Sequence, residues 1–125
     1  MNTSTLEEYW ADVIGFVGQY QISSKGNLLS LARTVPARNG TRSVRQQILR
    51  NRIIYKDKVV SAVTVKLSSP GTVSRTLTVP RLMLEAFYGV RGPLWVASPK
   101  DKNPENLDLD NWEWRRIGYT IHPGI

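Results

Sequence analysis

The sequence of 125 residues contains no cysteine and a single histidine, His122. The absence of cysteine excludes disulfide bonds and metal sites built from thiolates, and it fits a reducing compartment. No glycine-rich phosphate-binding loop is present either. A lone histidine near the C-terminus is usually solvated, so we expect neither a metal site around it nor a bound cofactor.

Long hydrophobic runs are also absent. No stretch approaches the roughly 20 apolar residues that a membrane-spanning helix needs, so we expect no membrane partner. Residues 1–12 carry Glu7, Glu8 and Asp12 and lack the apolar segment of a signal peptide, which predicts a cytoplasmic protein. With 41% hydrophobic residues and four tryptophans, the chain can bury the core of one domain.

Acidic residues are nearly missing from the middle of the chain. Residues 13–84 hold twelve basic residues and one acid, Asp57, which gives a net charge of +11, whereas the whole chain has +7. Clustered Arg and Lys neutralise phosphates, so we favour a nucleic acid partner over a solvated basic surface or an acidic protein. The candidate DNA-binding residues are Lys25, Arg33, Arg38, Arg42, Arg45, Arg50, Arg52, Lys56, Lys58, Lys66, Arg75 and Arg81.

The first half of the chain predicts a hairpin and a loop. Residues 7–31 alternate apolar and polar side chains around the turn at residues 24–27, which is typical of a β-hairpin. Residues 32–47 are rich in arginine and contain Pro36, Asn39 and Gly40, so we expect an exposed loop. Asn39, Gln46, Gln47 and Asn51 are possible readers of base edges, although a role as solvated surface is the one we favour.

The second half predicts three antiparallel strands and a helix. Strands are expected around residues 48–55, over residues 59–67 and over residues 73–79, with a turn at residues 68–71. In the second strand Val59, Ser61, Val63, Val65 and Leu67 should share one face. A helix should begin at Pro80 and end at Gly89.

The C-terminal third predicts less regular structure. We expect a short strand at residues 94–96, a polar loop over residues 98–110, a helical or extended piece from Asn111 and a tail over residues 118–125. The aromatic residues at apolar positions should lie in the core rather than stack on bases; these are Trp10, Tyr20, Phe87, Trp112 and Trp114.

Residues 8–31 read EYWADVIGFVGQYQISSKGNLLSL. This segment resembles the NUMOD motif, a nuclease-associated modular motif with the typical pattern E-x-W-x-x-I-x-G-Y-E-G-x-Y-x-V-S-N-x-G-x-V-x-S-L. The motif occurs beside the HNH nuclease domains of phage and intron homing enzymes. The resemblance implies a DNA-binding role.

Two later segments are similar to the HNH domain of the same enzymes. Residues 79–87, VPRLMLEAF, resemble its helix V-H-R-L-V-A-x-A-F, and residues 101–114, DKNPENLDLDNWEW, resemble the part of H-x-D-G-N-P-E-N-N-R-x-D-N-L-E-W that begins at its aspartate. The resemblance implies an α+β fold, with a small antiparallel sheet, a helix and a ββα-metal unit towards the C-terminus. It also implies a phage or mobile-element origin and a bacterial host cytoplasm.

The chain departs from this family where the family carries its histidines. The histidine of V-H-R-L falls on Pro80, and the histidine that opens H-x-D falls on Pro99. A nuclease of this kind needs a general base and a divalent metal, and proline has neither a titratable group nor a ligand atom. Asp101, Asn106 and Asn111 keep ligand-type side chains, so weak metal binding stays open, but turn formation is the simpler role.

These observations predict a NUMOD-like hairpin and Arg-rich loop over residues 1–47, a degenerate HNH-like unit over residues 48–117 and a tail. The predicted function is binding of double-stranded DNA without catalysis, as a repressor, an origin blocker or a competitor of an active nuclease. Two alternatives stay open: a phage structural or polymerase-associated protein that meets an acidic protein surface, and a residual metal-dependent nickase. RNA in place of DNA is a further option, and a homodimer is possible.

Overall fold

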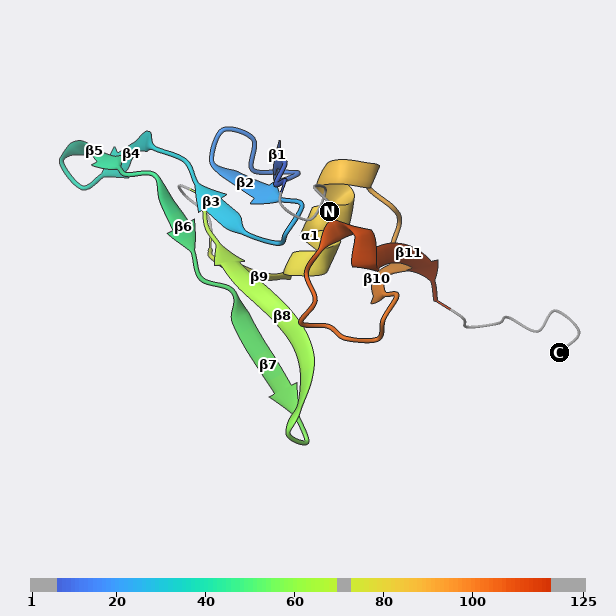
Figure 1. Cartoon of the computed structure of the whole chain (residues 1–125). Coiled ribbons are helices and arrows are strands. Elements are labelled where there is room, and N and C mark those ends of the chain that lie inside the picture. Colours follow the sequence, from blue (N-terminus) through green and yellow to red (C-terminus); the bar gives the residue numbers. More distant parts are fainter. Residues whose placement is uncertain (1–6, 70–72, 118–125) are drawn as a thin grey trace, which may run out of the picture.

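The computed structural model describes residues 7–69 and 73–117, and it has the α+β architecture that the sequence predicts (Figure 1). The first sheet is antiparallel, with the strand order β1-β2-β3-β6. Its strands are β1 (Trp10–Asp12), β2 (Tyr20–Ser23), β3 (Leu28–Ser30) and β6 (Gln47–Leu49). Residues 1–6 and 118–125, and with them His122 and the predicted tail, lie outside the described residues.

The second sheet has three antiparallel strands in the order β7-β8-β9, as predicted. These are β7 (Arg52–Lys56), β8 (Val59–Leu67) and β9 (Arg75–Thr78). Of the turn predicted between β8 and β9, Pro70 and Gly71 lie outside the described residues. Strand β9 begins only at Arg75, so Val73 lies before it and is exposed, which corrects the predicted start of this strand at residue 73.

The helix and a last pair of strands follow. Helix α1 (Val79–Tyr88) begins with Pro80 in its first turn and is followed by Gly89, whose N–H donates to the carbonyl of Glu85 at 3.1 Å. A proline fits there because the first N–H groups of a helix have no intrahelical partner. Strand β10 (Trp95–Pro99) pairs antiparallel with β11 (Trp112–Arg116), and a 3₁₀ turn, η2 (Leu109–Asn111), precedes β11. No helix within residues 7–69 and 73–117 is long and apolar enough to cross a membrane.

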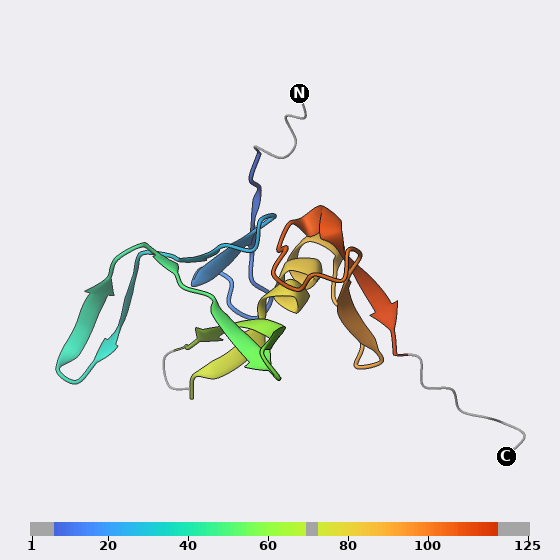
Figure 2. The ribbon, with the colours of Figure 1, turned by 60° about the horizontal axis from the view of Figure 1, so that its bottom comes forward.

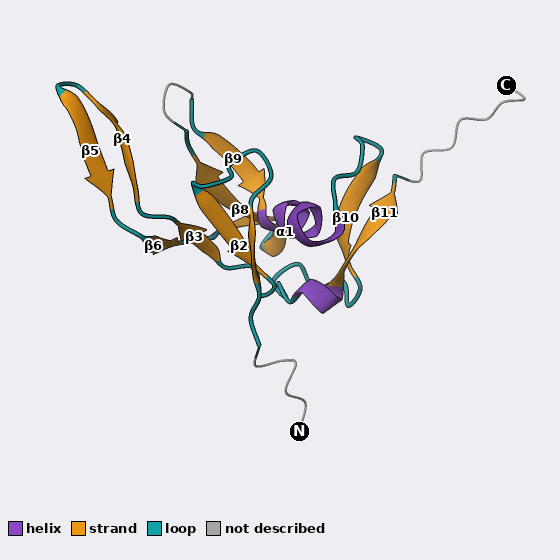
Figure 3. Ribbon diagram, turned by 90° about the horizontal axis from the view of Figure 1, so that it is seen from above, coloured by secondary structure: helices purple, strands orange, loops and turns teal. Residues whose placement is uncertain are grey.

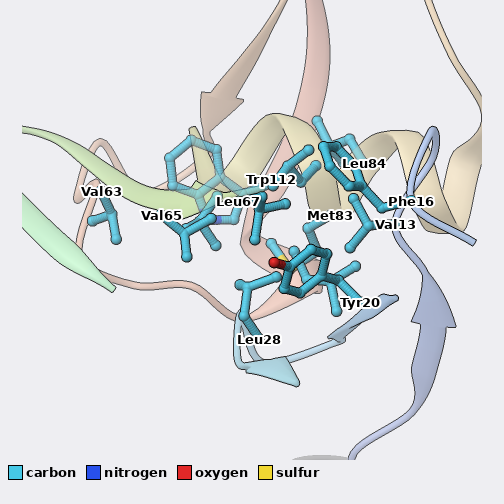
Figure 4. Close-up of a cluster of buried hydrophobic side chains, with 13 residues drawn as sticks. Val13, Phe16, Tyr20, Leu28, Val63, Val65, Leu67, Met83, Leu84 and Trp112 are labelled. Carbon is cyan, nitrogen blue, oxygen red and sulfur yellow. The ribbon is translucent and has the colours of Figure 1, made fainter. Parts of the chain in front are cut away.

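One hydrophobic core joins the N-terminal and C-terminal parts of the chain (Figure 4). Helix α1 contributes Val79, Leu82, Met83 and Leu84, and it lies between the sheets and the β10–β11 pair (Figure 3). The other buried members come from both sides of residue 47: Val13, Phe16, Tyr20, Ile22 and Leu28, and Val63, Val65, Leu67 and Trp112. Because β6 also pairs with β3, packing and hydrogen bonding both run across the boundary predicted at residue 47.

The aromatic residues follow the prediction with one exception. Tyr20 and Trp112 are buried in this core, and Phe87 and Trp114 pack against it. Trp10 is 38% exposed on strand β1, because that strand lies at the edge of its sheet.

Residues 33–44, predicted as a loop, form a two-stranded hairpin. Strands β4 (Arg33–Ala37) and β5 (Gly40–Val44) pair antiparallel, from Arg33 opposite Val44 to Ala37 opposite Gly40. Figure 2 shows this hairpin projecting from the body of the molecule. Its alternation is hard to recognise because almost every side chain is exposed and Pro36 stands inside a strand, which an edge strand tolerates.

A β-bulge changes the face that β8 presents. The β7–β8 register shifts between Ile54 and Tyr55, so that Tyr55 lies opposite Val60 and Lys56 lies opposite Val59. Val59 is therefore turned to the face opposite Val63 and is 66% exposed, which corrects the prediction that both share one face. The bulge depends on strand pairing and leaves no mark in the alternation of the sequence.

Gly26 lies at a close approach between the NUMOD-like hairpin and the C-terminal loop. It has a φ of +78°, and a Cβ atom added there would lie 2.6 Å from Cβ of Leu107. The Asn51 amide also donates to its carbonyl oxygen at 2.8 Å. Only glycine fits this backbone conformation and this space without strain.

We therefore predict that Gly26→Ala lowers the free energy of unfolding by about 1–3 kcal/mol, because the strained φ and the clash with Leu107 add up. Urea denaturation of the full chain measures the loss. Gly92→Ala is the control, since a Cβ there meets nothing within 4 Å, and it should change stability by no more than about 0.5 kcal/mol. Equal effects of the two substitutions would contradict the role of this contact.

Candidate nucleic-acid interface

Nine of the twelve predicted basic residues are exposed, and they lie on projecting parts of the structure. Arg38, Arg42 and Arg45 belong to the β4–β5 hairpin and its end. The other six lie on or beside the second sheet: Arg50, Arg52, Lys56, Lys58, Lys66 and Arg75. Lys25, Arg33 and Arg81 are partly buried.

A basic groove lies between the β4–β5 hairpin and the end of β8. Its volume is about 540 Å³, and its lining includes Arg33, Arg42, Gln47 and Lys66 and no acidic residue. Lys66 enters from the second sheet and Arg42 from the hairpin, so segments far apart in the sequence form the two walls. A groove with cationic walls and no acid attracts a polyanion.

The groove also contains polar groups that charge counting did not reveal. Ser30, Ser68 and Ser69 line it beside Tyr20. The Tyr20 hydroxyl donates to the carbonyl of Ser68 at 2.9 Å and accepts from the N–H of Ser68 at 3.2 Å, which fixes the end of β8 on the first sheet. Ser30 stands at the serine position of the NUMOD pattern, whereas no motif in the sequence marks Ser68 or Ser69.

Arg33 anchors the β4–β5 hairpin instead of standing free for a ligand. Its Nη1 atom donates to the carbonyls of Gln19 and Leu31 at 3.0 and 2.8 Å and to Oγ of Ser30 at 3.1 Å. Its guanidinium also lies 4.9 Å from the centroid of the Tyr20 ring. These bonds give Arg33 a structural role at the base of the hairpin, where it also lines the basic groove, and its predicted DNA contact stays a prediction.

Arg81 has a similar structural role on helix α1. It pairs with Glu85 at 3.2 Å, donates to the carbonyls of Trp95 and Arg91 at 2.7 and 3.1 Å, and lies over the Trp114 ring. These bonds hold α1 against the β10–β11 pair. Its guanidinium is therefore engaged within the fold, and its predicted DNA contact stays a prediction.

Pro80, at the position of a family histidine, lines an apolar hollow. The hollow has a volume of about 260 Å³ and is bounded mainly by β8, α1, β10 and Trp112, with no acid or histidine among its lining residues. Pro99, at the other family position, ends β10 opposite Trp112. Neither proline offers a group that activates water.

Asp101, Asn106 and Asn111 hold the C-terminal loop together through hydrogen bonds. Asp101 accepts from the N–H of Asn103 at 2.8 Å and from the Asn106 amide at 2.9 Å. Asn106 accepts from the N–H of Asp108 at 3.3 Å, and Asn111 accepts from the N–H of Asp101 at 3.0 Å. The carbonyl of Asn106 accepts from both the Asn111 amide and the Trp112 indole N–H.

This donor set does not fit a divalent metal. The three side chains supply one carboxylate and two amides, and all of them are used in turns of the loop. Within residues 7–69 and 73–117, no group of three or more histidine, aspartate or glutamate side chains is placed to hold a metal ion. The bonds instead match the turn-forming role expected for Asp and Asn.

Comparison with known proteins identifies a DNA-binding motif in the N-terminal half of the chain. Residues 8–57 match the family model of the NUMOD4 motif. The match extends past residue 47 into β7, and it confirms the resemblance seen in residues 8–31. A search of curated proteins gave no match.

A solved structure titled "DNA binding and cleavage by the HNH homing endonuclease I-HmuI" shares the fold, with a TM-score of 0.65 and 26% sequence identity. The similarity covers 86% of this chain and 52% of that one. This chain therefore corresponds to about half of the endonuclease chain. The α+β fold expected from the HNH-like segments is confirmed.

The loop bonds predict a pH-dependent effect of Asp101→Asn. The hydrogen bonds from Asn106 and Asn103 lower the pKa of the Asp101 carboxyl below its ordinary value of 3.8. A lowered pKa means that the ionised carboxylate stabilises the folded state above about pH 4, and that this stabilisation is lost as the pH falls through the folded-state pKa. Asp101→Asn places an amide against the Asn106 amide and removes the stabilisation.

Thermal unfolding should therefore show a lower Tm for Asp101→Asn at pH 7, with a difference from the wild type that shrinks below about pH 4. Glu105→Gln, in the same loop, is the matched control and should leave the Tm nearly unchanged. A Tm difference of constant size from pH 7 to pH 3 would contradict the account.

Proposed function

We propose that this protein binds double-stranded DNA through the basic groove and the two hairpins beside it, and that it does not cut the DNA. The observation that carries the proposal is the groove, where Arg42 and Lys66 face a ligand from opposite walls without a neighbouring acid. Its walls belong largely to the NUMOD4 segment, and the structural neighbour is described as binding DNA. Cationic side chains of this kind release counterions from phosphates.

The absence of cleavage is supported by the residues at the family's two histidine positions, which cannot act as a general base. Removal of a general base alone costs a nuclease about 10²–10⁴ in rate. Here Pro80 and Pro99 replace both family histidines, and Asp101 is bonded within its loop. Binding depends on other residues and survives this loss.

A protein that binds a DNA site without cutting it can act by excluding other proteins from that site. It can repress transcription, block an origin of replication or compete with an active nuclease for a shared site. Each role requires residence on duplex DNA in a bacterial host cell, and a homodimer would suit a palindromic site. Binding of an acidic protein surface instead would use the same cations and is separated by the salt experiment below.

Binding to a duplex should weaken steeply with salt. If six to eight of the exposed cations contact phosphates, affinity should fall about 10³-fold or more between 50 and 200 mM salt. Arg42→Gln and Lys66→Gln should each reduce the slope of log K against log salt by about 0.9. Fluorescence anisotropy with a labelled duplex measures these slopes.

Arg116→Gln is the matched control, because Arg116 is exposed on β11 and does not line the groove. Its salt slope should equal that of the wild type. The proposal would be contradicted if the protein bound no duplex even at 50 mM salt. It would also be contradicted if Arg116→Gln reduced the slope of log K against log salt as much as Arg42→Gln does.

The absence of cleavage predicts that supercoiled plasmid stays intact when incubated with the protein and either Mg²⁺ or Mn²⁺, under conditions where binding is saturated. Agarose gel electrophoresis resolves supercoiled, nicked and linear forms. Nicking that disappears in Asp101→Ala or Asn106→Ala would show a residual nickase and would overturn this part of the proposal.

A further inference from the structure

The β7–β8 hairpin presents apolar side chains that the core does not use. It projects from the body of the molecule, with its turn at the free end (Figure 1). Val59 is 66% exposed and Ile54 is 37% exposed, although both are β-branched and stand in regular strands. Exposed apolar groups on a projecting element indicate a contact surface.

These two side chains share a face with cations. In an antiparallel pair, residues directly opposite one another point to the same face. Lys56 lies opposite Val59, and Ile54 lies two residues from both Lys56 and Arg52 on β7. The bulge puts Val59 on this cationic face, because without it Val59 would have pointed to the side of the buried Val63.

The same face continues into the basic groove. Thr64 on β8 lies opposite Arg52, so these two side chains point to the same face. Lys66 is two residues after Thr64 on the same strand and therefore points to that face as well. Lys66 also lines the groove. From Lys66 to Val59 the strand extends roughly 23 Å, taking about 3.3 Å per residue, which is less than the roughly 34 Å of one turn of a DNA duplex.

On this basis, which rests on the proposed duplex binding, we propose that the β7–β8 hairpin lies in the major groove and that Val59 and Ile54 contact the methyl groups of thymines. A two-stranded ribbon fits the major groove, and the thymine methyl is the apolar group that the groove displays. Arg52, Lys56 and Lys66 contact the phosphates on either side. The hairpin thus gives the protein a preference for A·T pairs at the contacted steps.

An acidic protein partner would account for the cations but not for their alternation with small apolar side chains along one face. Duplex DNA supplies both kinds of partner at once, with phosphates at the edges of the groove and methyl groups on its floor. Two exposed apolar side chains of the hairpin lie on the other face: Ile53 lies opposite Val63, and Tyr55 lies opposite Val60. Tyr55, the more exposed of the two, therefore serves as an internal control.

The test compares duplexes that differ only in the thymine methyl. A site obtained by selection from a random DNA pool is synthesised with thymine and, in a second duplex, with uracil at every thymine position. The full-length wild-type protein should bind the uracil duplex about fourfold more weakly for each methyl contacted. Val59→Ala and Ile54→Ala should each reduce this thymine-to-uracil ratio, and the double substitution should bring it to one.

Tyr55→Ala is the matched control and should keep the wild-type ratio. Circular dichroism checks that each variant is folded, and the exposed Val59 site makes unfolding of that variant a small risk. A thymine-to-uracil ratio of one for the wild type, or a ratio that the double substitution leaves unchanged, would overturn the thymine contact. In either case, salt-dependent binding of both duplexes would still support the proposed function. Failure of the wild type to bind either duplex would overturn both.

Discussion

The packing of helix α1 is the constraint on which the other parts of the structure depend. Its buried face, centred on Met83 and Leu84, contacts side chains from the first sheet, the second sheet and the β10–β11 pair. A two-stranded unit such as the β10–β11 pair is marginally stable at best in isolation, so its packing on α1 is what stabilises it. All three pack on one helix and so share a common core, from which the β4–β5 hairpin projects (Figure 3).

This arrangement divides the basic residues into two kinds. Arg33 and Arg81 lie next to the core, where carbonyl oxygens accept hydrogen bonds from their guanidinium groups and aromatic rings lie beside them. The exposed cations lie on hairpins that contribute little to the core, so their charge is available to a ligand. The exposed cations are therefore separate from Pro80 and Pro99, the two positions at which the similar HNH segments carry histidine.

The parts of the structure that the sequence predicted are those with local signals. The helix from Pro80, the three-stranded sheet and the NUMOD-like hairpin follow from periodicity, turn residues and motif. The β4–β5 hairpin was not predicted, because exposed strands show no apolar alternation, and the bulge at Ser61 arises only from pairing. Charge alone likewise could not separate Arg33 and Arg81 from the exposed cations, because part of their bonding is to other segments of the chain, as with Gln19 for Arg33 and Trp95 for Arg81.

An NMR titration of the full-length protein with a DNA duplex in low salt tests the central claim most directly, because it reports each arginine and lysine side chain separately. The account predicts shifts for Arg42 and Lys66, with Arg115 and Arg116 on β11 unaffected. It also predicts that the DNA strands are recovered intact when Mg²⁺ is added at the end. Shifts confined to β11, no shifts at all, or cut strands after Mg²⁺ would contradict it.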